Sequence, residues 1–412
     1  MITLRKRSSV AADRRNLASL ATPASLVLLA SSIGARLPLA MLGLGLLVHA
    51  QRLSGSFAVA GLVTGAYAIV RGIAAPSVGR LVDRCGQTIV LLATAFVSAV
   101  LLAVVAFVPA TTPPAVLILL AAGIGLATPP LAACVRTLLP DIVADPEALP
   151  AAYALESTAL ELTFIFGPPL ALGLAAAWST SAALVASGLV LLTATAAFAA
   201  QPVSRHWRPR PGLPRRRGGA LRSPGMQTLV LILVGVGAVF GAVDVGVTAA
   251  ATALGNPGAA APLFGLWGVG SLLGGIAATR LGGGARRTRG LLLLLAGLTL
   301  GHAALAAVTG NLLAAGVVLL LAGAAIAPTY ASIYTMADKL APAGTLTEAF
   351  AWLLTAASIG TSAGAAIGGA VAQSAGAAPV FVLAGGAGAL AMLVAVLRSR
   401  TVDGTVPARG AV

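Results

Sequence analysis

The sequence has few charged residues, few aromatic residues and only two lysines. Asp, Glu, Lys and Arg make up 9% of its 412 residues, against roughly 25% in an ordinary soluble domain. A water-soluble globular fold is therefore excluded. Neither Lys6 nor Lys339 follows a glycine as a phosphate-binding loop requires, and the chain has no dinucleotide-binding fingerprint, serine elbow or kinase signature. The sequence predicts neither an enzyme nor a bound cofactor.

The few histidines and cysteines are too scattered to predict a metal site. His49, His206 and His302 lie on three distant segments, and no His-x-x-x-His or Cys-x-x-Cys spacing occurs. Cys85 and Cys134 both lie near predicted cytoplasmic helix ends, where disulfides rarely persist. We predict no metal and no disulfide.

What the sequence does have is a series of long apolar runs. Hydrophobic residues make up 58% of the chain, and its mean hydropathy is +0.98. About 20 apolar residues are needed to cross a bilayer as a helix. Twelve such segments are predicted, at about 23–50, 57–78, 88–108, 114–135, 151–177, 181–200, 227–253, 261–280, 290–309, 311–334, 347–373 and 377–397. We expect an all-α integral membrane protein with twelve transmembrane helices.

The two halves of the chain repeat each other. Gly79, Asp83, Arg84 and Gly86 recur at one constant offset as Gly275, Thr279, Arg280 and Gly282. Residues 153–167 and 350–364 align at almost the same offset. Internal repeats in a hydrophobic chain are typical of secondary transporters, whose substrate site lies between the repeats near the bilayer midplane.

The repeat and the composition together predict the domain organisation. A six-helix bundle at 23–200 is joined to a second six-helix bundle at 226–398 by a basic linker at 201–225. Residues 1–22 and 399–412 form the two terminal segments.

Basic residues predict the orientation in the membrane, because short cytoplasmic loops collect Lys and Arg. On one side lie the amino terminus, seven linker arginines and the groups Arg80 and Arg84; Arg286, Arg287 and Arg289; Lys339; and Arg398, Arg400 and Arg409. The opposite loops carry only Arg52. We predict a multi-pass plasma-membrane protein with both termini cytoplasmic. The net charge of +15 is explained by this topology, so nucleic acid is not a predicted partner.

The motif Gly79, Asp83, Arg84 and Gly86 resembles the signature between helices two and three of the major facilitator superfamily. That signature usually ends in two basic residues, where this chain has Gln87 and Thr88. The resemblance covers about residues 23–398 and implies the twelve-helix fold of that superfamily, with alternating access to a central site.

Two further resemblances indicate a branch of the superfamily. Arg136, late in helix four, resembles an arginine of many proton-coupled members. Gly167 and Pro168 in helix five resemble the antiporter motif of drug-exporting members, although Thr163 stands where that motif usually has glycine. These matches imply export driven by the proton gradient.

Six charged residues are predicted inside the membrane, where each costs about 2.5–3.5 kcal/mol unless it has a partner, a water cavity or a function. They are Arg36, Arg71, Arg136, Glu156, Glu161 and Asp244. Glu156, Glu161, Asp244 and Arg136 are our candidates for proton coupling.

Each of these charges has a structural alternative. Glu156 and Glu161 point roughly 140° apart on one helix, so they cannot both face one cavity. The simplest structural interpretation pairs Glu156 with Arg136. Arg36 either holds an anionic substrate group or pairs with Glu161. Asp244 has no cation near it in the sequence, which favours a functional role.

Aromatic residues make up only 4% of the chain, so few could stack on a flat substrate. With Arg36 and Asp244, the candidates for the substrate cavity are Trp267, Tyr330, Tyr334 and Trp352. Glycines at a spacing of four, Gly61 with Gly65 and Gly360 with Gly364 and Gly368, predict flat faces on helices two and eleven. Ordinary helix packing is an alternative explanation for any single pair, and the resemblance to the superfamily implies that helices two and eleven meet across the halves.

The segment from Gly79 to Gly86 is interpreted as a conformational latch on the cytoplasmic face. Asp83 lies just past helix two, at the end facing the cytoplasm, where it can meet the positive amino end of a neighbouring helix and a nearby arginine. The alternative is a solvated turn in which Asp83 caps its own segment.

The sequence as a whole predicts a proton-coupled transporter that exports a small organic compound. The alternatives are a symporter that imports a small metabolite and a non-transporting membrane sensor on the same fold. The expected partners are the lipid bilayer, the substrate and protons, and we expect a monomer.

Overall fold

The computed structural model describes residues 23–143, 145–207, 219–256 and 259–403. The terminal segments 1–22 and 404–412 and most of the predicted linker, 208–218, lie outside these ranges.

Every predicted span is helical in the described chain, with a break inside the fourth and the tenth. The first half holds α2 (Pro23–Ser54), α3 (Phe57–Cys85), α4 (Gln87–Phe107), α5 (Pro114–Leu126), α6 (Leu131–Ile142), α7 (Leu149–Ala177) and α8 (Thr180–Ala200). The second half holds α10 (Pro224–Ala253), α11 (Ala260–Arg280), α12 (Thr288–Ala304), α13 (Leu312–Gly323), α14 (Ile326–Leu340), α15 (Leu346–Ala375) and α16 (Ala377–Leu397). Short helices α9 (Pro202–His206) and α17 (Ser399–Asp403) follow the halves.

Eleven segments of the described chain are long and apolar enough to cross a membrane, with α5 and α6 joined as one segment and α13 and α14 as another. The 29-residue helix α7 is not among the eleven, but it occupies the fifth predicted position. Large aliphatic side chains cover the outer surface, as lipid contact requires: Leu313 is 84% exposed and Ile73 is 71% exposed. The predicted all-α membrane fold is confirmed.

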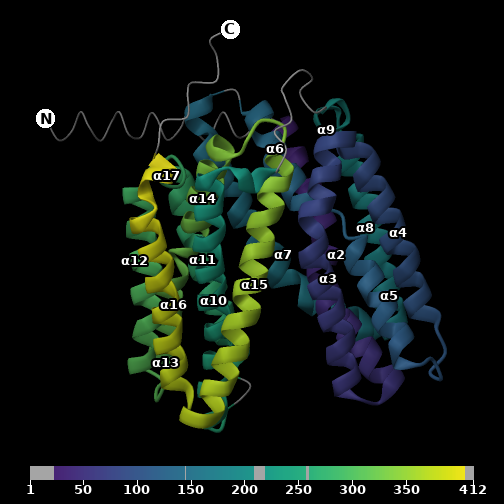
Figure 1. Ribbon diagram of the computed structural model, residues 1–412. Coiled ribbons are helices and arrows are strands. Elements are labelled where there is room, and N and C mark those ends of the chain that lie inside the picture. Colours follow the sequence, from purple (N-terminus) through teal and green to yellow (C-terminus); the bar gives the residue numbers. More distant parts are fainter. Residues whose placement is uncertain (1–22, 144, 208–218, 257–258, 404–412) are drawn as a thin grey trace, which may run out of the picture.

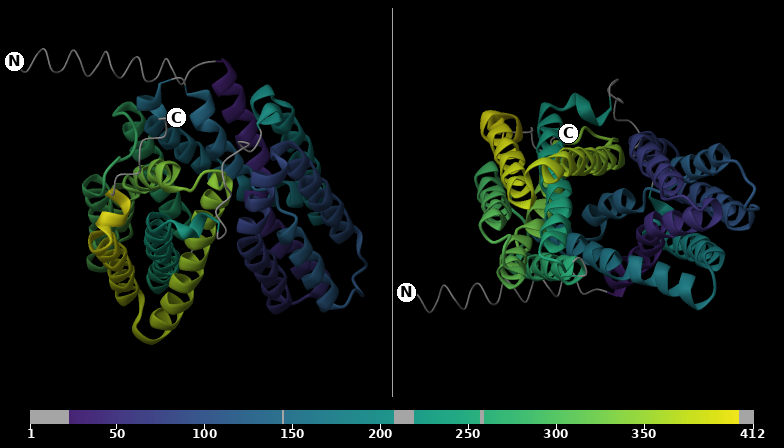
Figure 2. Two further views of the ribbon diagram at one scale, coloured as in Figure 1. Left: turned by 45° about the horizontal axis from the view of Figure 1, so that its top comes forward. Right: turned by 90° about the horizontal axis from the view of Figure 1, so that it is seen from below.

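The two halves lie side by side and meet mainly at one end. Figure 1 shows the two halves close together near α6 and diverging toward the other end; α9 and α17 lie at the same end as α6. We call the end where the halves meet the linker end, because α9 and the short 3-10 helix Ala220–Arg222, which flank residues 208–218 in the sequence, lie there. The main contacts between the halves come from two helices: α7 packs on α11 and α14, and α15 packs on α3 and α6. The second view confirms the side-by-side arrangement (Figure 2).

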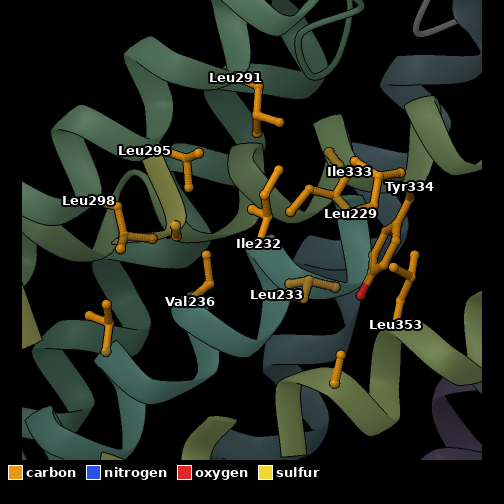
Figure 3. Close-up of a cluster of buried hydrophobic side chains, with 14 of the residues drawn as sticks. Leu229, Ile232, Leu233, Val236, Leu291, Leu295, Leu298, Ile333, Tyr334 and Leu353 are labelled. Carbon is orange, nitrogen blue, oxygen red and sulfur yellow. The ribbon is translucent and has the colours of Figure 1, made fainter. Parts of the chain in front are cut away.

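The second half has a continuous apolar core. Leu291, Leu295 and Leu298 of α12, spaced at three and four residues, are buried and lie near Ile232 and Val236 of α10 (Figure 3).

Glycines permit the close packing of α10 on α15. A Cβ at Gly360 or Gly364 would collide with the backbone carbonyl oxygens of Val234 or Ala238, both in α10. The prediction that these glycines face helix two is therefore wrong. Helix two, α3, does meet α15, but through Gly79 and through Thr355, whose hydroxyl donates to the carbonyl of Gly72 at 2.7 Å.

Candidate functional site

A cavity of about 850 Å³ lies between the two halves. Residues of α2, α3, α5, α6 and α7 line it from the first half, and residues of α10, α11, α14 and α15 line it from the second. The volume is within the range of small-molecule sites. Because both halves contribute walls, a movement of one half against the other changes the access to this cavity.

Two helices break at the level of the cavity. The fourth predicted helix is interrupted between α5 and α6, where Thr128, Pro129 and Pro130 line the cavity. The tenth is interrupted between α13 and α14, and Ile326 lines the cavity there. Non-helical backbone at membrane depth is tolerated where it lines a cavity or is buried in protein. Neither break was predicted from the sequence, although the double proline, which removes two backbone donors, was a signal for the first.

Three side chains of the first half form a buried charge cluster. The Glu156 carboxylate accepts hydrogen bonds from Arg36 Nη1 at 2.5 Å and from Arg136 Nε at 2.9 Å. Glu156 is 0%, Arg36 3% and Arg136 2% exposed. Arg36 also donates to the Ser32 hydroxyl at 2.9 Å. The predicted pair of Arg136 with Glu156 is present, but Glu156, rather than the suggested Glu161, is the partner that the structure gives Arg36.

Two other intramembrane charges at the cavity have no ion pair with any described residue. Arg71 of α3 makes its only hydrogen bond within the described ranges to the Tyr67 hydroxyl, at 3.4 Å. Asp244 of α10 faces the cavity, and its carboxylate has neither a hydrogen bond nor an ion pair with any residue that the structure describes. The side chains of Glu161 and Pro168 lie outside the described residues.

An aromatic wall closes the second-half side of the cavity. Phe240, Trp267 and Tyr330 line it, and the rings of Phe240 and Trp267 meet edge to face with centroids 5.3 Å apart. Behind them, the Trp267 indole N–H donates to His302 Nε2 at 2.9 Å, and His302 Nδ1 lies 2.6 Å from the Leu298 carbonyl. His302 is therefore the tautomer protonated at Nδ1. No spacing rule in the sequence pointed to Phe240 or His302.

The remaining aromatic candidates have different positions. Tyr334 lines the cavity, and the Arg136 guanidinium lies 3.9 Å from its ring centroid, a cation–π contact. Trp352 does not line the cavity. Its indole N–H donates to Glu348 at 3.3 Å near the start of α15, so its assignment to the substrate cavity is wrong. Trp352 belongs to α15, a helix that does line the cavity, but it lies near the start of that helix and its side chain contacts Glu348.

The linker end of the cavity is closed by a contact between α3 and α15. The Asp83 carboxylate accepts hydrogen bonds from the backbone N–H groups of Thr347 at 3.2 Å and Glu348 at 2.9 Å, in the first turn of α15. Arg80 donates to Glu348 at 2.9 Å. The carboxylate thus meets the positive end of a helix in the other half, which is the contact expected of a latch. The alternative, in which Asp83 caps its own segment, is not formed in the described chain.

Two glycines of the motif shape this contact. Gly79 lies against the first turn of α15, where an added Cβ would lie 3.1 Å from the Thr347 carbonyl oxygen. Gly86 joins α3 to α4 with φ +90°, a conformation that other residues rarely adopt. Arg84 is exposed, and the described chain offers it no hydrogen bond or ion pair. Gly167 serves a separate contact, because a Cβ there would lie 2.6 Å from the Ala40 Cβ of α2.

The matching contact of the repeat is built without a carboxylate latch. Thr279, at the position of Asp83, donates its hydroxyl to the Gly275 carbonyl of its own helix at 2.8 Å. The amino end of α7 instead packs its backbone at Pro150 on Gly283. An exposed ion pair of Arg286 with Glu147 lies beside it. The closure at the linker end is therefore asymmetric, with its buried charge on one side only.

The described ranges hold no cluster of three or more His, Cys, Asp or Glu side chains that could bind a metal ion.

Comparisons with known proteins agree with this architecture. No curated protein sequence matches the chain. Among solved structures, the chain is similar to a bacterial homologue of the iron transporter ferroportin in an outward-facing state, with a TM-score of 0.73 and 15% identity over 92% of this chain and 100% of that one. It is also similar to the human organic anion transporter MFSD10 (TETRAN), with a TM-score of 0.67 and 18% identity over 91% of this chain and 100% of that one. At these identities the similarity shows the fold alone.

The family model of the Major Facilitator Superfamily matches residues 24–347. This match spans most of both halves and the segment between them. The members of this family are secondary transporters rather than enzymes. The chain therefore belongs to the Major Facilitator Superfamily.

Proposed function

We propose that this transporter exports a small organic compound in exchange for protons. The observation that carries the proposal is Asp244, a carboxylate without a partner among the described residues that faces a cavity shared by the two halves. Intramembrane carboxylates that line a cavity mark proton and substrate pathways. Glu161, one of the other predicted carboxylates, is the second candidate for the proton site. Glu156 is bound between two arginines and serves the structure of the first half.

The arginine distribution supports a cytoplasmic linker end. Under that orientation, the contact of Asp83 with α15 closes the cytoplasmic side, and the structure corresponds to a state that opens outward. Plasma-membrane localisation and a monomeric state belong to the same proposal. Export rather than import rests on the resemblance of Gly167 and Pro168 to an antiporter motif, so a proton symporter that imports a metabolite is the second candidate function.

Single cysteines test the orientation. Cys85 is exposed and Cys134 buried, and both are free, so the background carries Cys85→Ser and Cys134→Ala. In intact cells, an impermeant thiol reagent is expected to label Thr111→Cys and Gly310→Cys but not His206→Cys, since all three positions are exposed. Labelling of His206→Cys with protection of the other two would reverse the orientation. Ser204 is a poor reporter because it is buried and bonded to Gln87.

Proton coupling is tested by carboxylate replacements. A growth screen of a transporter-deleted host against toxic compounds identifies a compound to which expression gives resistance. In proteoliposomes, Asp244→Asn or Glu161→Gln is expected to abolish proton movement driven by that compound, because the amide cannot bind and release a proton at neutral pH. Asp145→Asn, at an exposed position of the linker end, is the control. Parental proton flux in both Asp244→Asn and Glu161→Gln would show that neither carboxylate carries the proton.

A further inference from the structure

We propose that the cavity binds an organic anion with a flat apolar body. In this pose, the acid group binds Arg71 in the first half, and the body lies against Phe240, Trp267 and Tyr330 in the second. The inference rests on the proposed transport function and adds the chemical class of the substrate.

The charges of the first half support an anion. Arg36 and Arg136 share the single carboxylate of Glu156, and Arg71 has no carboxylate partner in the described part of the chain. Within the first half, three arginines exceed two glutamates even if Glu161, whose side chain lies outside the described residues, is counted. The third carboxylate of the set, Asp244, lines the cavity from α10 in the second half, so the positive charge is concentrated on the first-half side. A guanidinium in a cavity of low dielectric needs an anion, and its planar donors match carboxylate, sulfonate or phosphate oxygens.

The opposite wall supports a flat apolar body. Tyr330 stacks on Phe240 with a centroid distance of 6.1 Å and an interplanar angle of 29°. Trp267 meets Phe240 edge to face, and its one N–H is already bonded to His302. The wall therefore offers ring surfaces without offering the indole donor. Aromatic ligands pair well with such surfaces in stacked or edge-to-face arrangements.

Asp244 orients the ligand within the cavity. It lies four residues after Phe240, one turn along α10, on the aromatic side of the cavity. Its negative charge repels an acid group and therefore directs that group toward Arg71. A cationic substrate would reverse this arrangement, with Asp244 as its counter-ion and the arginines as repelling groups.

Three probes of matched shape distinguish these arrangements: 2-naphthoate, 2-naphthalenemethanol and 2-naphthylmethylammonium. Binding to the purified full-length protein in detergent is measured by isothermal titration, without a proton gradient. We expect 2-naphthoate to bind about tenfold or more tightly than the neutral alcohol, since the alcohol has neither the negative charge nor the second acceptor oxygen that a bidentate pair with Arg71 uses. The ammonium probe should bind more weakly still.

The variants test the residues. Arg71→Gln should remove the preference for naphthoate over the alcohol, Arg71→Lys should restore part of it, and Asp244→Asn should strengthen naphthoate binding. Arg289→Gln, at an exposed arginine outside the cavity, is the control and should bind as the parent does. Circular dichroism and size-exclusion profiles check that each variant is folded, and the Lys variant keeps the test valid if the Gln variant fails to fold.

Tighter binding of the ammonium probe, equal binding of the alcohol, absence of naphthoate binding, or full naphthoate preference in Arg71→Gln would each overturn the proposal. These outcomes are separate from those of the coupling experiment. If the protein binds naphthoate but moves no protons, only the proposed proton coupling is refuted. If it exchanges protons for a cation, only the proposal of an anionic substrate is refuted.

Discussion

Glu156→Gln is expected to destabilise the folded protein severely. The carboxylate is the shared partner of Arg36 and Arg136, and all three side chains are at least 97% buried. The amide leaves two guanidinium groups buried beside a neutral group. Removing one partner of a buried ion pair costs about 3–5 kcal/mol. We expect little folded protein in membranes and a thermal transition far below that of the parent.

Glu147→Gln is the matched control for this substitution. Glu147 also pairs with an arginine, Arg286, but its side chain is 76% exposed. Exposed ion pairs contribute about 0–1 kcal/mol, so the control should melt close to the parent. The measurement is fluorescence-detected size exclusion after heating of both variants in the same detergent. A Glu156→Gln variant that melts with the control would show that the cluster is not needed for the fold.

Asp83→Asn is expected to shift the protein toward a state that is open at the linker end. The carboxylate is 5% exposed and accepts two backbone hydrogen bonds at the amino end of α15. A charge in that position contributes about 0.3–1 kcal/mol when exposed and up to ~2 kcal/mol when partly buried. Each ~1.4 kcal/mol changes an equilibrium tenfold. Since α3 and α15 belong to different halves, the loss acts only on the state in which this end is closed.

Accessibility of the cavity measures this shift. A cysteine at Ser358, which lines the cavity, is probed with an impermeant thiol reagent in vesicles that expose the linker end. We expect labelling to be about tenfold faster in Asp83→Asn than in the parent, with lower transport and nearly parental thermal stability. Asp145→Asn is the control, because Asp145 is exposed and, among the described residues, accepts a hydrogen bond only from the backbone of its own turn at Glu147. Equal labelling in all three proteins would leave Asp83 as a structural cap.

The sequence predicted the fold and the contacts that depend on position along a helix. The repeated motif located the ends of α3 and α11, and the closeness of two helix ends predicted the pair of Arg136 with Glu156. The sequence did not predict how each helix is rotated about its own axis, and therefore which neighbour each side chain faces. The sequence therefore left Arg36 with either a substrate anion or Glu161 as its partner and did not indicate Glu156, and Trp352 was placed in the cavity although it contacts Glu348.

Packing between helices was the other limit. Glycines placed four residues apart predict a flat helix face, but they do not predict which helix packs on that face. The face on α15 packs on α10 rather than on α3. The aromatic wall depends on residues of three helices, Phe240, Trp267 and Tyr330, and on a fourth helix that supplies His302. No local pattern connects such residues, because only the tertiary fold brings them together.

The central claim is that the two halves open and close the cavity at alternate ends. Double electron–electron resonance on two pairs of spin labels, in a background without native cysteines, measures this directly. One pair, at His206 and Lys339, spans the halves at the linker end, and the other, at Arg52 and Ser374, spans them at the opposite end; all four positions are exposed.

We expect two distance populations for each pair. The population with a longer linker-end distance should match in size the population with a shorter distance at the opposite end, and both should grow in Asp83→Asn. A single unchanged distance at both ends across pH 5 to 8, in the parent and in Asp83→Asn, or distances that change in the same direction at both ends, would contradict alternating access.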